Sequence, residues 1–395
     1  MNEIKKWMGQ LPIQILLMLV SSVMFTPFLS KDAIGIFYSI SCLFKDALMV
    51  ILPLITFTYM FASMLKFAKS APKLLFTILV TVIVSNVFSF ALPYGLAQLL
   101  IPFLDLGQGL DLAPINETIQ CLIQLPIPSF WTPKNGMVMG LVLGIFLNFF
   151  SYPLVLKATQ SLKDHVSYVL NQFFIPLIPV FVFGFFSKLQ YEGSVNVLFQ
   201  GYGKVLLIVL PIYFSYLFLG FLVVNRFHFI KTYQHIKESI AAFVTAFSTM
   251  SSLATMPLML KVAQKHTGQE EFSEFIIPSV INIHMMGDGI MFSTMIVSLF
   301  YLFHTPLPTF GAFLMFLYYY LLARFSTAGV PGGTTLILMP LTISYLGFTN
   351  EMASVFLTLG IVLDSFCTMG NVAGNILYAS FAYQTFGKDL LSKKS

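Results

Sequence analysis

The sequence predicts an all-α membrane protein that contains two re-entrant helical hairpins. Of its 395 residues, 57% are hydrophobic and only 9% are charged, whereas a soluble domain carries about 25% charged residues. The apolar runs continue for about 18 residues or more without alternating apolar and polar positions, which indicates membrane helices rather than barrel strands. Small and polar residues interrupt two later runs, which predicts backbone breaks inside the membrane.

Charged residues mark the ends of the apolar runs. If the N-terminus, with Lys5 and Lys6, is cytoplasmic, the lysine-rich loops after the second, fourth and sixth runs are cytoplasmic too, and the acidic stretch 105–135 is external. This distribution predicts a multi-pass protein of the inner cell membrane with both termini in the cytoplasm. The first run is long and no clear cleavage site follows it, so we expect no signal peptide. The uninterrupted runs are 11–29, 34–65, 74–104, 136–156, 166–187 and 205–224.

Net charge and cysteine content argue against several classes of protein. The formal net charge of +5 comes from lysines at the ends of runs, so it does not indicate a nucleic-acid partner. Cys42, Cys121 and Cys367 are widely spaced and show neither a disulfide framework nor a metal-binding spacing. We expect Cys42 and Cys121 to be small packing residues.

An internal repeat relates the two interrupted segments, 238–260 and 307–345. Both breaks begin with Phe-Ser-Thr and continue to Met-Pro-Leu, and a Met-Gly pair follows at the same separation, at Met286–Gly287 and Met369–Gly370. Gly and Pro in the second break disfavour a continuous helix. We predict two hairpins with tips at 248–257 and 326–335, which meet at a solute site near the bilayer midplane. Paired broken segments of this kind are typical of secondary transporters.

Four ionisable residues lie within apolar surroundings: His284, Asp288, Arg324 and Asp364. A charge at the bilayer centre costs at least about 2.5–3.5 kcal/mol, so such residues normally face a partner, a cavity or a solute. The alternative is a buried ion pair that only holds helices together.

Helical spacing places Asp364, Cys367, Thr368, Asn371 and Asn375 on one stripe of the last helix. A carboxylate there can accept hydrogen bonds from an ammonium group, and the threonine and asparagines can bind a carboxylate or an ion. The alternative for such a stripe is hydrogen bonding between helices.

Three motifs carry a resemblance to a known family: the first tip Met250–Pro257, the second tip Thr327–Gly332 and the pattern from Asp364 to Asn375. Here the chain resembles the dicarboxylate/amino acid:cation symporter family, which includes the glutamate transporters. The resemblance follows the whole chain in segment order and is strong in its last third. It implies eight transmembrane helices plus two re-entrant hairpins, inverted repeats, a homotrimer, and an elevator-type movement of a transport domain past a scaffold.

The resemblance also implies a division of the chain. Scaffold helices 1 and 2 fall in 1–73, and helix 3 of the transport domain with an external loop falls in 74–135. Scaffold helices 4 and 5 together with helix 6 fall in 136–224. The transport core of hairpin 1, helix 7, hairpin 2 and helix 8 falls in 236–390.

Site residues are carried over position by position. Asp364 matches the aspartate that holds the substrate α-amino group, and Asn371 matches the asparagine that contacts its α-carboxylate. Ser252 matches a first-tip serine that reaches the same carboxylate, and the second tip matches the gate. The substrate-binding candidates are Ser251, Ser252, Val330, Pro331, Gly332, Asp364, Cys367, Thr368 and Asn371.

One departure concerns the substrate. Acidic-substrate members have an arginine where Cys367 stands, and an acidic side chain without a cation would be costly in a low-dielectric site. We therefore predict a small neutral amino acid. The alternative is an acidic amino acid or dicarboxylate symporter in which Arg324 replaces the missing arginine.

A second departure concerns the coupling ion. The family's Asn-Met-Asp-Gly-Thr motif aligns with His284–Asp288, so its metal-binding carboxylate is Met286 here, and its last aspartate is Asn375. A thioether is a poor ligand for a hard ion, so we predict that sodium coupling is reduced or lost. We expect no cofactor beyond a possible Na⁺ or H⁺ as coupling ion, and no metal assignment follows from the sequence.

Two explanations stay open. Either Asp288 replaces the lost carboxylate and sodium still binds, or coupling is to protons or absent. In the second case, Arg324 pairs with Asp288 or Asp364 in place of a cation, unless it extends to the aqueous surface instead. The coupling candidates are His284, Asp288, Arg324, Asn371 and Asn375. The rival classes are an intramembrane enzyme, which would need a third ligand beside His284 and Asp288, and a channel lined by the broken hairpins.

Overall fold

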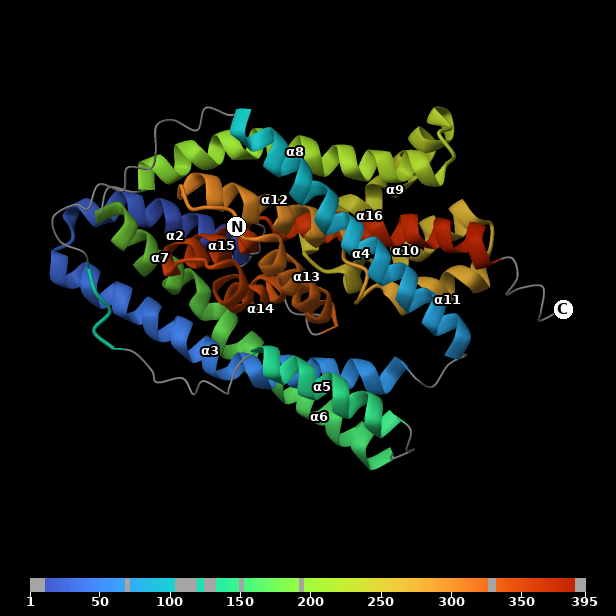
Figure 1. The fold of residues 1–395 in the computed structure, drawn as a ribbon, viewed down its shortest axis with the longest axis horizontal. Coiled ribbons are helices and arrows are strands. Elements are labelled where there is room, and N and C mark those ends of the chain that lie inside the picture. Colours follow the sequence, from blue (N-terminus) through green and yellow to red (C-terminus); the bar gives the residue numbers. More distant parts are fainter. Residues whose placement is uncertain are drawn as a thin grey trace, which may run out of the picture. The chain divides into compact units, whose positions relative to one another are not determined.

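The structure is a computed structural model that describes residues 11–67, 72–103, 119–123, 133–148, 153–191, 195–325 and 332–387. All regular elements among these residues are helices (Figure 1). The chain divides into two compact units. Unit 1 comprises Met1–Ser70, Leu104–Val205 and Leu299–Val362, and unit 2 comprises Ala71–Phe103, Leu206–Ser298 and Leu363–Ser395.

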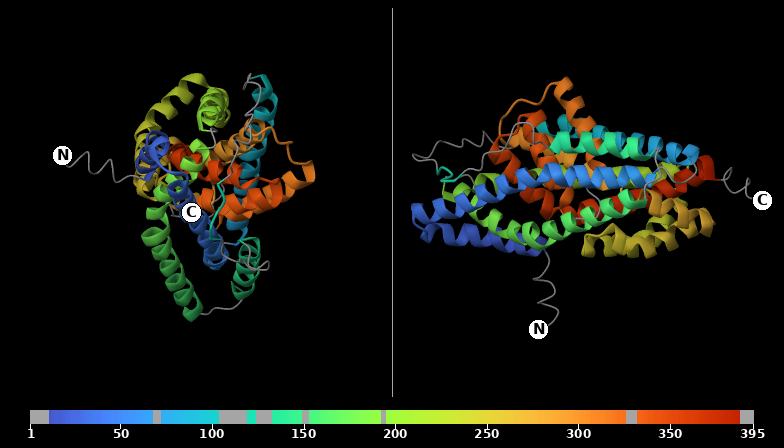
Figure 2. Two further views of the ribbon diagram at one scale, coloured as in Figure 1. Left: turned by 90° about the vertical axis from the view of Figure 1, so that its left-hand side faces the viewer. Right: turned by 90° about the horizontal axis from the view of Figure 1, so that it is seen from below.

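In unit 1 the long helix α3 forms the centre, with α5 and α7 packed along it (Figure 2). Small residues allow the backbones to approach closely, as in other membrane helix pairs. A Cβ added at Gly140 of α5 would lie 2.6 Å from the carbonyl oxygen of Phe57 in α3. The α-helices of this unit are α2 (Leu11–Phe25), α3 (Lys31–Phe67), α5 (Pro133–Asn148), α6 (Pro153–Val169), α7 (Ile175–Tyr191), α13 (Phe310–Arg324), α14 (Gly333–Leu341) and α15 (Asn350–Val362).

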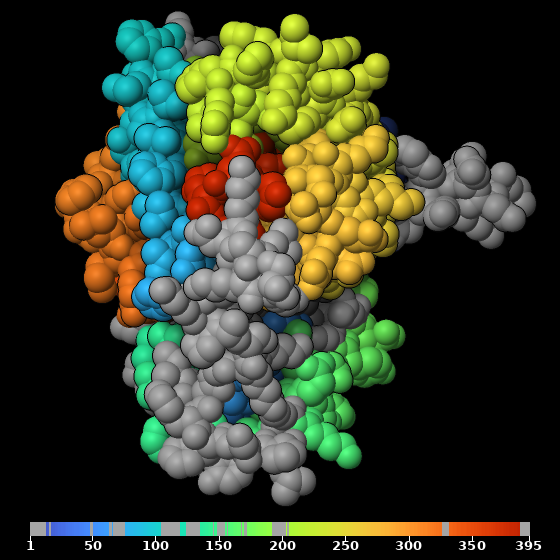
Figure 3. All heavy atoms as spheres, turned by 90° about the vertical axis from the view of Figure 1, so that its right-hand side faces the viewer, coloured from blue at the N-terminus to red at the C-terminus, as the bar shows by residue number. Residues whose placement is uncertain are grey.

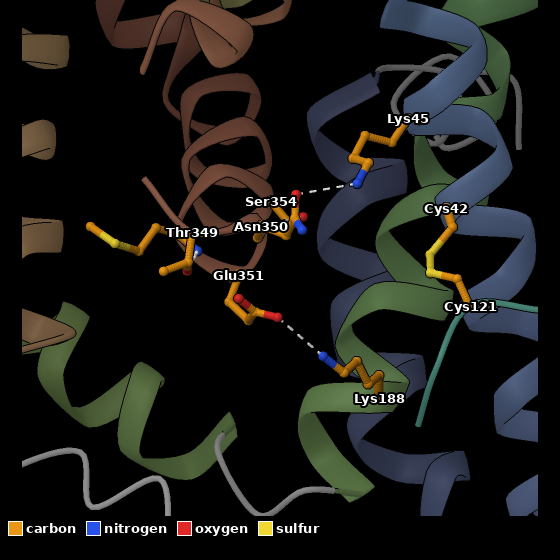
Figure 4. Close-up of polar contacts among 9 residues, drawn as sticks. Cys42, Lys45, Cys121, Lys188, Thr349, Asn350, Glu351 and Ser354 are labelled. Carbon is orange, nitrogen blue, oxygen red and sulfur yellow. Dashed lines mark hydrogen bonds and ion pairs between the residues drawn. A yellow bond between two sulfur atoms is a disulfide. The ribbon is translucent and has the colours of Figure 1, made fainter. Parts of the chain in front are cut away.

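A disulfide fastens the segment 119–123 to α3. Cys42 and Cys121 are bonded across a sequence separation of 79 residues (Figure 4). One turn away, the N–H of Leu122 donates to Ser39 Oγ at 3.1 Å. The expectation that these two cysteines only fill space is therefore wrong, because spacing along the chain says little about which distant residues a fold brings together.

Two lysines hold the start of α15 within unit 1 (Figure 4). Lys188 of α7 lies 3.3 Å from Glu351 Oε1, and Lys45 of α3 donates to Asn350 Oδ1 at 3.3 Å. Lys188 keeps only 7% of its side-chain surface exposed. These contacts attach the start of α15 to α3 and α7.

In unit 2 the helix α16 lies at the centre, in contact with α9, α10 and α11. Figure 3 shows α16 in red between α4 in blue, α8 and α9 in yellow-green, and α10 and α11 in gold. The helices of this unit are α4 (Pro72–Leu100), most of α8 (Val195–Val224), α9 (Phe229–Thr249), α10 (Ser252–Thr267), α11 (Glu270–Val280), most of α12 (Met286–Leu302) and α16 (Asp364–Ala382).

Four helices of the described chain are long and apolar enough to cross a membrane: Lys31–Ala62, Phe76–Phe103, Gln172–Tyr191 and Val205–Val224. The pair Asn350–Val362 and Asp364–Gly387 adds a fifth if it forms one broken span. The predicted run 136–156 is not one helix, because α5 ends at Asn148 and α6 begins with Pro153, a residue suited to a first helical turn. The full set of eight spans remains a prediction.

Helices α9 and α10 form the first predicted hairpin. They pack against each other within unit 2 and are joined by Met250 and Ser251. Met250 has a left-handed φ of 50°, and Ser251 Oγ caps α10 by accepting from the N–H of Ala254. In the second segment, α13 ends at Arg324 and α14 begins at Gly333. Its tip, 326–331, lies outside the described residues, and re-entry of either segment into the membrane remains a prediction.

Candidate functional site

The predicted polar stripe lies on α16, which begins at Asp364. Asp364 is half-buried, whereas the other four members of the stripe are buried. A carboxylate in the first turn of a helix is favoured by the helix dipole. Polar side chains inside such an apolar unit must be satisfied by neighbours, solute or water. The buried members are Cys367, Thr368, Asn371 and Asn375.

Asn371 is joined to Asp288 by two hydrogen bonds. Its Nδ2 donates to Asp288 Oδ1 at 2.7 Å, and the backbone N–H of Asp288 donates to Asn371 Oδ1 at 3.1 Å. Asp288 is only 3% exposed and Asn371 only 8%. Asp288 lies in the first turn of α12, so this pair connects the start of that helix to the polar stripe.

The two Met-Gly pairs of the repeat meet where α12 crosses α16. A Cβ added at Gly370 would lie 2.6 Å from both Gly287 Cα and the hydroxyl oxygen of Tyr213. A Cβ at Gly287 would lie 2.7 Å from Gly370 Cα. Neither position has room for a side chain, so the glycines set the close approach that brings Asp288 within reach of Asn371.

Helix α4 contributes two polar residues that the sequence analysis missed. A hydrogen bond of 2.8 Å joins Ser85 Oγ to His284 Nε2. Asn86 Nδ2 donates to the carbonyl oxygen of Ile283 at 2.8 Å, and Asn86 Oδ1 accepts from the N–H of Met285 at 3.2 Å. Asn86 thus satisfies the backbone between α11 and α12. The signal available was the set of polar residues at helical spacing inside the run 74–104.

His284 and Asp288 are four residues apart, a spacing that would put them on one face of a helix, but they do not lie on the same helix. Helix α12 begins at Met286, so His284 belongs to the turn before it. His284 is fully buried and contacts α4, whereas Asp288 contacts α16. Asn86 holds the turn in this conformation, which separates the two side chains.

Asn375 lies on the same side of α16 as His284. A Cβ on the neighbouring Gly374 would be 3.3 Å from His284 Cε1 and 3.4 Å from Met286 Sδ. Asn375 is fully buried. Its side chain interacts with the imidazole of His284. A thioether, an imidazole and a neutral amide therefore gather here, where a hard cation would prefer carboxylate or carbonyl oxygens.

The remaining candidates are distributed over both units. Ser251 and Ser252 begin α10 in unit 2 and are half-buried. In unit 1 Arg324 is fully buried, with its guanidinium 4.0 Å from the centre of the Tyr320 ring, a cation–π distance. Gly332 precedes α14 with φ 65°. Val330 and Pro331 lie outside the described residues, and pairing of Arg324 with either aspartate remains a prediction.

The described residues contain no group of three or more His, Cys, Asp or Glu side chains that could hold a metal ion. The polar cluster is instead built from hydrogen-bonded pairs on α4, α12 and α16. In comparison with known proteins, the sodium:dicarboxylate symporter family matches the chain over residues 11–384.

Proposed function

Because this chain belongs to the sodium:dicarboxylate symporter family, a family of secondary transporters, we propose that it carries a small neutral amino acid by an elevator mechanism, with sodium coupling reduced or lost. Membership in the family and the apolar helices make it a multi-pass membrane transporter that takes a small-molecule substrate, and they exclude the enzyme alternative. We further propose the homotrimer and the scaffold and transport domains that the resemblance implies.

The observation that carries the proposal is the chemistry of the α16 stripe. It offers one carboxylate, at Asp364, and a buried thiol at Cys367. No lysine or arginine occurs in 206–225, 238–260, 266–298 or 363–387, which form most of unit 2. A zwitterion can place its ammonium at Asp364 and its α-carboxylate at polar groups such as Thr368. A second carboxylate on the substrate would have no cation within these segments.

The hydrogen bonds of Asp288 support the second part of the proposal. The carboxylate that could replace the family's lost metal ligand already accepts from Asn371. The imidazole of His284 is bonded to Ser85, and Met286 supplies only sulfur. We propose that protein hydrogen bonds take over part of the role of bound sodium, with proton coupling or exchange as the energy source.

Arg324 favours a second candidate, an acidic amino acid or dicarboxylate symporter. It is the one fully buried arginine of the described chain, and the family's description names dicarboxylates as substrates. If Arg324 faces the solute, it would supply the cation that Cys367 does not.

A binding screen tests these alternatives. The midpoint of thermal unfolding of purified protein is measured with serine, alanine, threonine, aspartate or succinate, each in sodium and in choline buffer. We expect stabilisation by a neutral amino acid in both buffers, and loss of that shift in Asp364→Asn. Stabilisation by aspartate or succinate alone favours the second candidate, and a shift seen only in sodium contradicts reduced coupling.

A further inference from the structure

The corner between α8 and α9, by which we mean residues 225–237, combines positive charge, exposed apolar surface and a hydrogen-bonded backbone turn. The candidate span Val205–Val224 ends directly before the residues that join the two helices, so we expect the corner at the level of the lipid headgroups. Arg226 and Phe227 have φ values of 52° and 61°, a left-handed conformation that bulky residues rarely adopt. Backbone hydrogen bonds from Arg226 to Val223 and from Phe227 to Leu222 hold this turn.

Large apolar side chains project from this corner. Phe227, Phe229, Ile230 and Tyr233 are 64%, 67%, 80% and 68% exposed. So much apolar surface is costly in water, whereas aromatic side chains are favoured at a membrane interface. The exposed side chains of the corner are therefore suited to a membrane interface.

The corner is also positively charged. Arg226, Lys231 and Lys237 are exposed, and no acidic residue occurs between Arg226 and Glu238. Glu238 faces α10, where it lies 3.7 Å from Lys265 Nζ and 3.4 Å from His266 Nε2. Basic residues beside a span attract anionic headgroups.

An apolar cavity of about 320 Å³ adjoins these elements within unit 2. Phe218 and Phe221 of α8, Ile236 and Phe243 of α9, and Ala373 of α16 are among its lining residues. Ile236 directly precedes Lys237, so apolar lining and positive charge are adjacent on α9. The cavity volume lies at the lower end of the range for small-molecule sites.

We infer that the α8–α9 corner and this cavity form a binding site for an anionic phospholipid. The headgroup phosphate pairs with Arg226 and Lys231, and part of an acyl chain enters the cavity. The hydrogen bonds of the turn hold the backbone of Arg226, which reduces the entropy lost on binding.

Lipid-dependent thermal unfolding of the full-length protein in detergent tests this site. We expect dioleoyl phosphatidylglycerol to raise the unfolding midpoint saturably by several degrees, and 0.5 M salt to weaken the effect. Dioleoyl phosphatidylcholine and glycerol 3-phosphate should give less than half of that shift. Equal stabilisation by phosphatidylcholine would overturn the charge recognition, and an equal effect of glycerol 3-phosphate would identify a free-anion site instead.

Variants locate the effect. Replacing both basic residues (Arg226→Gln with Lys231→Gln) should reduce the phosphatidylglycerol shift by at least half without moving the midpoint in detergent alone. Ile236→Trp, which partly fills the cavity, should reduce it as well. The matched control is Lys261→Gln, an exposed lysine of α10, a helix that contributes no residue to the proposed site. Unchanged shifts in both the double variant and Ile236→Trp would overturn the inference.

Discussion

Asn371 donates a 2.7 Å hydrogen bond to Asp288 and accepts one from its backbone N–H. This pair joins the first turn of α12 to the polar stripe of α16 inside unit 2. It satisfies the buried carboxylate with a neutral donor of the protein.

The first prediction concerns this pair. Asn371→Ala removes a side-chain donor from the buried carboxylate, which should cost about 1–3 kcal/mol of stability and lower the unfolding midpoint. Asp288→Asn retains a hydrogen-bonding partner and should lower it less. Ser298→Ala is the control, because Ser298 is buried and donates to the carbonyl oxygen of Thr294 in its own helix. If Asn371→Ala and Ser298→Ala lower the unfolding midpoint equally, the hydrogen bonds between Asn371 and Asp288 add no more stability than a hydrogen bond within one helix.

The second prediction concerns substrate choice. Cys367→Arg introduces a buried cation into the stripe, so aspartate uptake relative to serine uptake should rise by roughly tenfold or more, about 1.4 kcal/mol in relative transition-state stabilisation. Cys367→Ser, which stays small and neutral, should keep the wild-type preference. The readout is competitive uptake into proteoliposomes. An unchanged preference in Cys367→Arg would place Cys367 away from the substrate side chain.

The third prediction tests the crossing of the two glycines. Gly370→Ala forces a methyl group against Gly287 and Tyr213, and such overpacking typically costs about 1–3 kcal/mol. Gly95→Ala in α4 meets nothing within 4 Å and should be neutral or stabilising by up to about 1 kcal/mol. The measurement is the midpoint of thermal unfolding of each variant, which should fall for Gly370→Ala and not for Gly95→Ala. If Gly370→Ala is as stable as Gly95→Ala, the helices do not cross at this distance.

The fourth prediction uses the stacked rings of His235 and His266, outside the candidate spans, whose centres are 3.7 Å apart. The pKa of His266 is lowered to about 3, first by burial and then by the charges of His235, Lys231 and Lys265. Burial also lowers the pKa of His235. The unfolded chain therefore binds protons below pH 6.5 that the folded chain does not. Stability should be full above pH 6.5 and fall by about 1.4 kcal/mol per pH unit for His266 below it.

Thermal unfolding between pH 7.5 and pH 4.5 checks the prediction. His266→Phe keeps a ring in the stack and should flatten the profile, whereas His165→Gln, at an exposed histidine of α6, should not. A profile for His266→Phe that still falls as steeply as wild type would mean that other groups cause the acid sensitivity.

The fifth prediction concerns the disulfide. Denatured, unreduced protein should bind maleimide at Cys367 alone, and reduced protein at all three cysteines. Cys121→Ser should expose a second thiol without reductant. Disulfides persist in oxidising compartments, which agrees with the prediction that the loop 105–135, which contains Cys121, is external. Three reactive thiols without reductant would contradict the bond.

The sequence predicted the helical class, the family and the polar stripe, because lipid leaves few backbone choices and helical spacing fixes which residues share a face. The repeat also identified Gly287 and Gly370, which meet in the structure. Three features were not accessible in this way. The Cys42–Cys121 bond, the use of Asn86 to hold a distant turn, and the start of α12 after His284 all depend on tertiary contacts.

Uptake by the purified protein in proteoliposomes tests the central claim most directly. Labelled serine, alanine and aspartate are supplied to vesicles in sodium or choline medium, with and without an inward proton gradient. The account predicts saturable uptake of a neutral amino acid well above that of aspartate, retained largely in choline. Uptake of aspartate far above serine or alanine, with strict dependence on sodium and no response to pH, would contradict it.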